Sequence, residues 1–498
     1  MHARRSLHAF LLCAALGCER SGARAAGHRE LGPAVLFVRA PHLTAAIALL
    51  APADGSQERP FGSIAEALRA APPGALLRLE EGVYEERLLI TRPVVLLGRG
   101  PGRTRILGQA GEGPQAPVVE VRGADLVELR GLALETGTVG LLLGNGTGVR
   151  LDDVGLRGFS EAAVIGQGAR LTMRGSEVLD IGHGHAGRGI DLTGGTLDAS
   201  SVVMRGAGRR AFILRGTRAV LADVDAAWSP VSAVQAVDGA DVRVLRGHFE
   251  HLGGAALYAG GARLSVEGAT IVGNEYAVIG FRGAEVSVTD AELLDHVVAA
   301  VALVRSRGTV KRCHIWHGGT DGGIAITHGS APIALLDNRI QEPGPMGLHI
   351  TESKVSARGN IITGARLDGQ KELGDAIFAI NSEVQLDQNV LRGNAGSGVT
   401  MLSSELKLTG NGLLDNGHAG LLLLNRSTAV ARGNLFERNG AAGVEIAETS
   451  RATLAENRFG ANPQFDIDVV CGAGGGGAVT IEGGNTFAAE TAREHVCP

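Results

Sequence analysis

A short segment recurs along most of this chain, and its spacing restricts the folds that the chain can form. Each copy starts with a small residue and continues with mostly apolar residues, as in the segment 211–214, Ala-Phe-Ile-Leu. Most copies follow one another at intervals of 21 to 24 residues. We call the first residues of the copies the anchors: Gly140, Ala163, Gly189, Ala211, Ala233, Ala256, Ala277, Ala300, Gly323, Gly347, Ala376, Gly398, Gly420, Gly443 and Asp466. A unit of this length buries its apolar side only by stacking on its neighbours, which indicates a solenoid.

The residues between the anchors have the period of β-strands. Segments 263–267 and 285–289 alternate apolar with polar side chains, as half-buried strands do. The chain has 75 glycines, is 44% hydrophobic and is only 3% aromatic, which suits a long, thin core that is filled one coil at a time. We therefore predict an all-β fold, a single-stranded right-handed parallel β-helix solenoid of about fifteen or more coils.

Two series of asparagines repeat with the same period as the anchors. They are Asn389, Asn411, Asn434 and Asn457, and Asn394, Asn416, Asn439 and Asn462. Stacked Asn side chains hydrogen-bond their copies in the next coil and tolerate turn conformations, so we predict two structural ladders. His314 lies nine residues before its anchor, as the first series does, and we interpret it as a substitute in that ladder rather than a ligand.

Two intervals are longer than the rest. They measure 26 and 29 residues and end at the anchors Gly189 and Ala376. Each predicts a loop that leaves the regular coil, and such loops often carry function. The first contains His183 and His185, and the second contains Lys371.

The first 25 residues have the pattern of an export signal. Arg4 and Arg5 precede a short apolar stretch at 9–16, which is too short to span a bilayer. Two forms of processing remain open, lipidation at Cys18 and cleavage after Ala25. We expect a location in the cell envelope or outside the cell, with a bacterial lipoprotein as the favoured form and any membrane contact made through a lipid at Cys18.

We divide the remaining chain into an N-terminal extension at 26–52, the β-helix at 53–490 and a tail at 491–498. Within the segment 60–74, Ser63 is a helix cap for the amphipathic stretch 63–70, and Pro-Pro-Gly at 72–74 ends it. Because the first coil of a solenoid leaves its strand edges unpaired, we expect this helix to cover that end.

Charge and cysteine usage exclude some classes of partner. The net charge is −5, and no long Lys or Arg run is available to follow a phosphate backbone, so we expect no nucleic acid. Cys471 and Cys497 are close enough in sequence to close one C-terminal loop, which leaves Cys313 free. No cysteine spacing resembles a zinc or haem site, and we assign neither a metal nor a cofactor.

Several segments resemble the opening of pectate-lyase-like right-handed parallel β-helix proteins: 53–56, 60–68, 72–74, 82–86 and 96–100. The Asn-rich coils after 380 are similar to the carbohydrate-binding and sugar-hydrolase repeats of that superfamily. The resemblance implies the fold and a polysaccharide partner. It implies no single chemistry, because the superfamily includes lyases, hydrolases, epimerases, esterases and members without known catalysis. The catalytic motifs of its pectin methylesterases, polygalacturonases and alginate epimerases are absent or incomplete here.

Two groups of polar residues are candidate sites. Asp321, His349 and Asp375 lie at similar distances from three consecutive anchors. Coils stack about 4.8 Å apart, which predicts carboxylates on the order of 10 Å apart with the imidazole between them. Such a spacing fits an inverting glycosidase, and it equally fits solvated surface carboxylates.

The second group is His183, His185, Arg188 and Asp191 around the first long loop, where the His pair fits a metal and the Arg and Asp fit an acidic sugar. A solvated loop is the alternative. His317 flanks Asp321 and is a further ligand-binding candidate, as is Lys371 in the second loop.

The second residue after each anchor should lie on the outer face, and this column is unusually apolar. It contains Leu142, Ile165, Ile213, Tyr258, Ile279, Phe378 and Leu422. A bound partner, the segment 27–50 or a ligand groove would each account for it. We therefore expect an exported protein that binds a polysaccharide or another surface component without catalysis. The alternative is a polysaccharide hydrolase, lyase or epimerase that uses acidic and His residues on adjacent coils. The oligomeric state is left open.

If Cys18 carries a lipid, replacing it removes the only expected membrane attachment. We expect Cys18→Ala to move the protein from the membrane fraction to the soluble fraction, as measured by fractionation of expressing cells. An unchanged partition would favour cleavage after Ala25.

Overall fold

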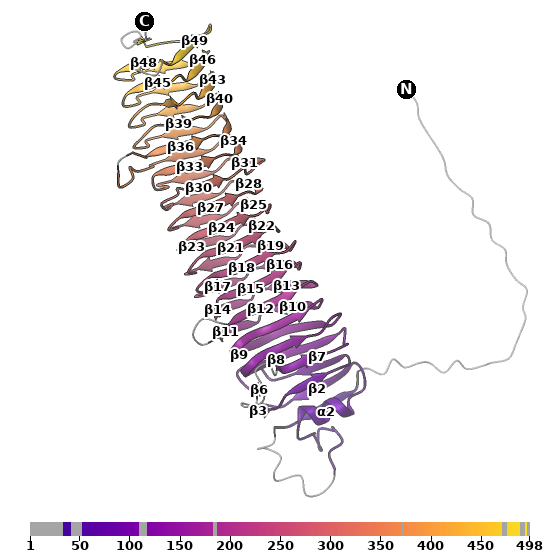
Figure 1. Ribbon diagram of the computed structural model, residues 1–498. Helices are drawn as coiled ribbons and strands as arrows, with labels where there is room; N and C mark the ends of the chain where they lie inside the picture. The colour runs from indigo at the N-terminus through magenta and orange to yellow at the C-terminus, as the bar shows by residue number, and fades with distance from the viewer. Residues whose placement is uncertain are drawn as a thin grey trace, which may run out of the picture.

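A computed structural model describes residues 33–40, 52–108, 117–182, 187–370, 372–470, 476–488 and 494–495. The described chain is an all-β parallel solenoid of about 17 turns, and its strands stack along one axis (Figure 1). Every pairing between successive coils is parallel and in register, with one irregularity between Gly137 and Val139. The predicted solenoid is therefore confirmed.

Each regular coil contributes one strand to each of three sheets. The first sheet contains β1 (Val35–Val38), β2 (Ala75–Leu79), β5 (Val94–Leu97), β10 (Arg170–Arg174), β13 (Thr196–Ser200), β16 (Arg218–Ala222), β19 (Asp241–Leu245), β22 (Arg263–Glu267), β25 (Glu285–Thr289), β28 (Arg307–Lys311), β31 (Ile333–Leu336), β34 (Lys354–Arg358), β37 (Glu383–Asp387), β40 (Glu405–Thr409), β43 (Thr428–Arg432), β46 (Arg451–Ala455) and β49 (Ala478–Ile481). Two long strands, β8 (Val127–Leu143) and β9 (Gly148–Gln167), run through all three sheets.

The second sheet has the shortest strands, because the chain turns sharply on either side of it. It contains β3 (Gly82–Glu85), β6 (Thr104–Leu107), β11 (Glu177–Ile181), β14 (Val203–Ala207), β17 (Asp225–Ala227), β20 (His248–Glu250), β23 (Thr270–Val272), β26 (Glu292–Leu294), β29 (His314–Trp316), β32 (Arg339–Gln341), β35 (Ile361–Thr363), β38 (Val390–Arg392), β41 (Gly412–Leu414), β44 (Leu435–Glu437) and β47 (Arg458–Gly460).

The third sheet includes the strands that contain or directly follow the anchors. It contains β4 (Leu88–Ile90), β7 (Pro117–Val121), β12 (Arg188–Thr193), β15 (Arg210–Arg215), β18 (Ser232–Val237), β21 (Ala255–Gly260), β24 (Tyr276–Phe281), β27 (Ala299–Val304), β30 (Ile324–Thr327), β33 (Met346–Thr351), β36 (Asp375–Ile380), β39 (Val399–Leu402), β42 (Leu421–Leu424), β45 (Ala442–Ile446), β48 (Phe465–Val469) and β50 (Glu494–His495).

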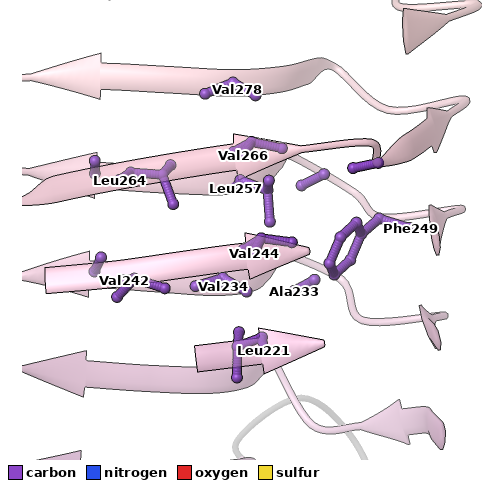
Figure 2. Packing of buried hydrophobic residues seen from close by; sticks show 14 of the residues in the cluster. Leu221, Ala233, Val234, Val242, Val244, Phe249, Leu257, Leu264, Val266 and Val278 are labelled. Carbon is purple, nitrogen blue, oxygen red and sulfur yellow. The ribbon is translucent and has the colours of Figure 1, made fainter. Parts of the chain in front are cut away.

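The core is one continuous column of side chains inside the three sheets. The residue after each anchor stacks on its counterpart in the next coil, as in Val234, Leu257 and Val278, which are all 0% exposed (Figure 2). Leu264 and Val266 of the first sheet and Phe249 of the second point into the same space. The anchors themselves are small because the next coil passes closely: a Cβ added to Gly189 would lie 2.3 Å from the carbonyl oxygen of Ala211.

Asparagine ladders fill two corners of the coil, as predicted. The Asn411 side chain accepts hydrogen bonds from the backbone N–H and Nδ2 of Asn389, at 2.8 and 2.9 Å, and its own Nδ2 donates to Oδ1 of Asn434 at 3.0 Å. The series that contains Asn394 and Asn416 repeats this pattern at the next corner. Both ladders thus satisfy buried backbone groups where the chain leaves the sheets.

The prediction for His314 was wrong. His314 pairs with Arg339 in the second sheet, and Cys313 occupies the ladder position, where its N–H donates to Oδ1 of Asn338 at 3.0 Å. The reason is one additional residue in the turn before the anchor Gly323, which moves the ladder one place back along the sequence. Cys313 is a free thiol, and burial raises its pKa to about 11.

A third ladder, of serines, fills the corner between the third and first sheets. Each member donates its backbone N–H to the hydroxyl of the next at 3.0 to 3.2 Å. The members are Ser306, Ser330, Ser353, Ser382, Ser404, Ser427 and Ser450. Small hydroxyl residues fit this corner because each also donates to a nearby carbonyl, as Ser404 does to Leu402 at 2.8 Å.

The N-terminal end of the solenoid is covered as expected. Helix α2 (Ile64–Ala70) begins after Ser63, whose hydroxyl accepts from the backbone N–H of Glu66, and its buried face is Ile64, Ala67 and Leu68. The carboxylate of Glu86 accepts from the backbone N–H groups of Ile64 and Ala65, both at 2.8 Å, which adds a charge at the favourable helix end. No helix among the described residues is long and apolar enough to span a bilayer.

The solenoid begins earlier than the boundary at residue 53. Strand β1 pairs with β2 in parallel, with Val35 opposite Leu76, so the segment 33–40 forms the first rung of the first sheet. This part of the predicted extension therefore does not lie over the outer face of the third sheet. Cys18, Cys471 and Cys497 fall outside the described residues.

The ladders predict a specific loss of stability. Asn411→Ala leaves the buried N–H of Asn389 and the carbonyls of Leu386 and Thr409 without their partner, so we expect unfolding to become easier by about 2–4 kcal/mol. Urea denaturation measures the change. The control Lys407→Ala, on the outer face of the same coil, should stay within about 0.5 kcal/mol. Equal effects of the two variants would contradict the role of the ladder.

Candidate functional site

The outer face of the third sheet carries two aligned columns of side chains. One is the residue before each anchor, and the other is the second residue after it. Register places Arg188, Arg210 and Ser232 in the first column on consecutive coils, and Ala325, His349 and Phe378 in the second. We call the surface formed by these two columns the third-sheet track. The second column is the one that the spacing of the anchors predicted to face outward.

The apolar stripe lies within this track. Leu142, Ile165, Tyr258, Ile279, Phe378 and Leu422 are half-buried there, and Ile213 is buried. Midway along the track, Ala299, Ala302 and Ala325 form a small apolar cluster with Tyr276 and Ile279, separate from the solenoid core. The track thus combines apolar contact area with the polar residues described next.

Asp321, His349 and Asp375 do lie on three consecutive coils. Asp321 is exposed in the turn before β30, where its N–H donates to the carbonyl of Val298 at 2.9 Å. His349 is half-buried in β33, and Asp375, at the start of β36, is only 5% exposed. The three side chains have similar places in their coils but differ strongly in burial.

His349 is held in an environment that favours the neutral imidazole. Burial lowers its pKa, and the charge of Asp321 opposes that shift only in part. Its Nε2 lies 3.2 Å from the Thr351 hydroxyl, and its Nδ1 is buried without a hydrogen-bond partner. The ring centre is 6.4 Å from that of Phe378 on the next coil. Asp321 and His349 therefore act on one another electrostatically, and one ring nitrogen is left available.

Asp375 faces away from His349 and toward the following coil. Its Oδ1 accepts from the backbone N–H of Ser397 on the next coil at 2.5 Å. Burial raises the pKa of Asp375 to about 6, and the nearby His418 opposes the shift. The carboxyl thus belongs with the following coils, and the structure gives it no contact with His349.

Two residues near Asp375 extend this group and were missed from the sequence. His418 Nδ1 lies 3.4 Å from the Ser397 hydroxyl, and His418 Nε2 lies 3.7 Å from Oε2 of Glu445. Burial raises the pKa of Glu445. Both could have been found by the rule applied to the first group: His418 lies two residues before its anchor, as Asp321 does, and Glu445 lies two after, as His349 does.

The second predicted group is an ion-pair network. Arg188 donates to Asp191 at 2.6 Å and also bonds Glu161, and Arg215 on the next coil bonds the other oxygen of Asp191. Asp191 is only 5% exposed, so both its oxygens are engaged within the protein. A cavity of about 240 Å³ adjoins the network and is lined by Val139, Leu142, Glu161, Ile165 and Arg188. His183 and His185 lie outside the described residues.

The remaining candidates lie away from the track or outside the described chain. His317 is at the corner between the second and third sheets, where its ring contacts Asp295 at 2.8 Å and Glu342 at 3.2 Å and stacks on Trp316. Its two nitrogens are therefore engaged with carboxylates. Lys371 is outside the described residues. Within the described chain, no group of three or more His, Cys, Asp or Glu side chains could hold a metal ion.

Comparisons with known proteins agree with the fold. Residues 347–489 match a family model described as the right handed beta helix region, and no curated protein matches the chain. Over this part of the chain the family model agrees with the predicted right-handed parallel β-helix.

Several solved structures are similar at low identity. One is the catalytic unit of a thermostable GH87 α-1,3-glucanase from Streptomyces thermodiastaticus strain HF3-3. It is 13% identical over 85% of this chain, with a TM-score of 0.30. The chain covers 66% of that structure, slightly under two thirds. The periplasmic alginate epimerase AlgG is 11% identical over 73% of this chain and 76% of that one, with a TM-score of 0.30. The A-module of the Azotobacter vinelandii mannuronan C-5 epimerase AlgE6 is 13% identical over 85% and 93%, with a TM-score of 0.21.

The buried Asp375 predicts a pH-dependent stability. Because burial raises its pKa from 3.8 to about 6, the folded protein keeps a proton that the unfolded chain has already released. Stability should therefore fall as the pH rises from about 4 to about 6, by on the order of 3 kcal/mol.

Asp375→Asn keeps the neutral form at every pH, so we expect the variant to lack this fall and to be more stable than the wild type at pH 7. Thermal unfolding across pH 4 to 8 measures both effects, with the exposed Asp321→Asn as the control for loss of one charge. Parallel curves for wild type and Asp375→Asn would contradict a buried, proton-retaining carboxyl.

Proposed function

We propose that this protein binds a polysaccharide along the third-sheet track, without catalysis, in the cell envelope or outside the cell. The observation that carries the proposal is the track itself. It repeats two outward positions on every regular coil and fills them with apolar side chains and with polar groups, among which Ser232 Oγ and His349 Nδ1 have no hydrogen-bond partner.

The repeat of the track suits a polymer. Coils stack about 4.8 Å apart, so a ligand that lies along the axis meets the same two positions again and again. Sugar rings present apolar C–H faces and polar hydroxyl edges, and binding sites for such molecules combine apolar surface with a few polar groups. In the track, Tyr258, Ile279 and Phe378 supply the apolar surface. Gln235 and His349 supply the polar groups.

Binding is favoured over hydrolysis because the carboxyls are not arranged across one reaction centre. Hydrolysis by an inverting glycosidase needs two carboxyl groups that face the same bond from opposite sides. Asp321 acts on His349 of the following coil, and Asp375 likewise bonds Ser397 of the coil that follows its own, so the two carboxyls do not converge on one point. The location in the envelope rests on the export signal at 1–25 and on Cys18.

The track predicts which variants lose binding. Phe378→Ala removes apolar contact area in the middle of the track, and we expect it to weaken binding of the best polysaccharide from an array of acidic and neutral glycans by about tenfold. Val430→Ala removes an exposed apolar side chain, 52% accessible, from the first sheet and should leave binding unchanged. Equal binding by the two variants would place the ligand on another face, and no binding by the wild type to any glycan would end the proposal.

A polysaccharide-active enzyme is the second candidate, and one observation favours it. The pKa of Asp375 is raised to about 6, and Asp375 lies near His418, which in turn contacts Glu445, as expected of a general acid with a basic neighbour. The same glycans are therefore to be assayed for new reducing ends, unsaturated products and epimerised residues. Turnover that disappears in Asp375→Asn while binding is retained would replace the binding proposal with this one.

A further inference from the structure

One stretch of the track, on β12, β15, β18 and β21, carries an excess of positive charge. Arg188, Arg210 and Ser232 are in register on the first three of these strands, in the column before the anchors. Arg215 lies at the end of β15. Arg188 and Arg210 are one coil repeat of about 4.8 Å apart. Arg215, at the other end of β15, reaches Asp191 and acts electrostatically on Arg210.

The two carboxylates of this area form ion pairs with only two of its three arginines. Asp191 bonds Arg188 with one oxygen and Arg215 with the other, and Glu161 bonds Arg188. The guanidinium of Arg210 has no hydrogen-bond or ion-pair partner among the described residues. Its guanidinium is half-buried, and burial together with the charges of Arg209 and Arg215 lowers its pKa. A cation left unpaired in this way is costly for the fold alone.

Further polar side chains follow Arg210 on the next coils of the track. The hydroxyl of Ser232, in register with Arg210 on the next coil, is buried and has no hydrogen-bond partner, and the residue is only 3% exposed. Gln235 and Tyr258 follow in the second column of the track on β18 and β21, half-buried. A guanidinium, a hydroxyl, an amide and a phenol, all on the outer face of neighbouring coils, are the donors that an oxyanion requires.

We propose that Arg210 and Ser232 form a subsite for one oxyanion, a carboxylate or a sulfate, carried by the polysaccharide that lies along the track. This inference rests on the proposed function and adds that the ligand is acidic. The planar guanidinium of Arg210 bonds both oxygens of the anion, and the Ser232 hydroxyl donates to one of them. Arg188 and Arg215 do not bind the anion, because Asp191 and Glu161 already neutralise them.

The test compares ligands that differ only in charge. Wild type, Arg210→Ala, Arg210→Lys and the control Arg218→Ala are titrated by calorimetry with hexamers of galacturonate and of mannuronate and with their carboxyl-reduced, neutral counterparts. Dextran sulfate and unmodified dextran make the corresponding pair for sulfate. Arg218 is an exposed arginine on the first sheet, so its loss removes the same charge from another face.

We expect the wild type to bind at least one acidic glycan about tenfold or more tightly than its neutral partner. In Arg210→Ala, the affinities for the acidic glycan and for its neutral counterpart should differ by no more than about twofold. Arg210→Lys should keep part of the preference for the acidic glycan, and Arg218→Ala should keep all of it. A preference that survives in Arg210→Ala, or a wild type that binds acidic and neutral glycans alike, overturns the oxyanion subsite while the binding function stands.

A separate readout distinguishes the subsite from the proposed function. Inorganic sulfate should raise the unfolding temperature of the wild type and of Arg218→Ala by more than that of Arg210→Ala, in which only the general salt effect of sulfate is left. If the wild type binds no glycan and this sulfate effect is present, the oxyanion site stands and polysaccharide binding fails. If the wild type binds no glycan and sulfate stabilises the wild type and Arg210→Ala equally, both proposals fail.

Discussion

Parallel backbone pairing between successive coils is the constraint on which the rest of this molecule depends. Each coil hydrogen-bonds the one before and the one after it, so a change of length inside a strand would break the register of the whole stack. The chain accommodates most extra residues where it leaves the sheets, as between Gly364 and Gly374, and one at the irregularity between β8 and β9. The corners carry the buried polar groups that the sheets cannot pair, and the Asn and Ser ladders satisfy them.

The same constraint decides which residues can form a site. Side chains become neighbours when they have the same position in successive coils, so partners are separated by about one repeat in sequence. Arg215 reaches Asp191 in this way, and Ser397 reaches His418. A site on such a face is therefore assembled from single residues, one or two from each coil, and its shape follows the solenoid axis.

Much of this could be predicted from the sequence, because the repeat expresses the pairing directly. The anchors, the Asn ladders, the capping helix after Ser63 and the outward column after the anchors all follow from spacing alone. The serine ladder was missed because Ser is common and its hydroxyl contact leaves no distinctive pattern. His314 was placed one residue out of register because a turn of variable length separates it from its anchor.

The candidate site was only partly predictable, since spacing gives the position of a residue and not its surroundings. Asp321 and Asp375 have similar offsets, yet the first is exposed and the second is buried under the following coil. Arg210 was missed because Asp191 lies on the neighbouring coil and is the ion-pair partner to be expected for it. Only the structure shows that Arg188 and Arg215 already occupy both oxygens of Asp191.

The asparagine ladders also give the solenoid an electrical direction. In each, Oδ1 accepts from the preceding coil and Nδ2 donates to the following one, so every side-chain carbonyl points back toward the N-terminal end. Aligned dipoles of this kind polarise one another and add along the stack rather than cancel. The two ends of the ladder region therefore differ in potential, with partial negative charge at the coil of Asn338 and partial positive charge near Asn485.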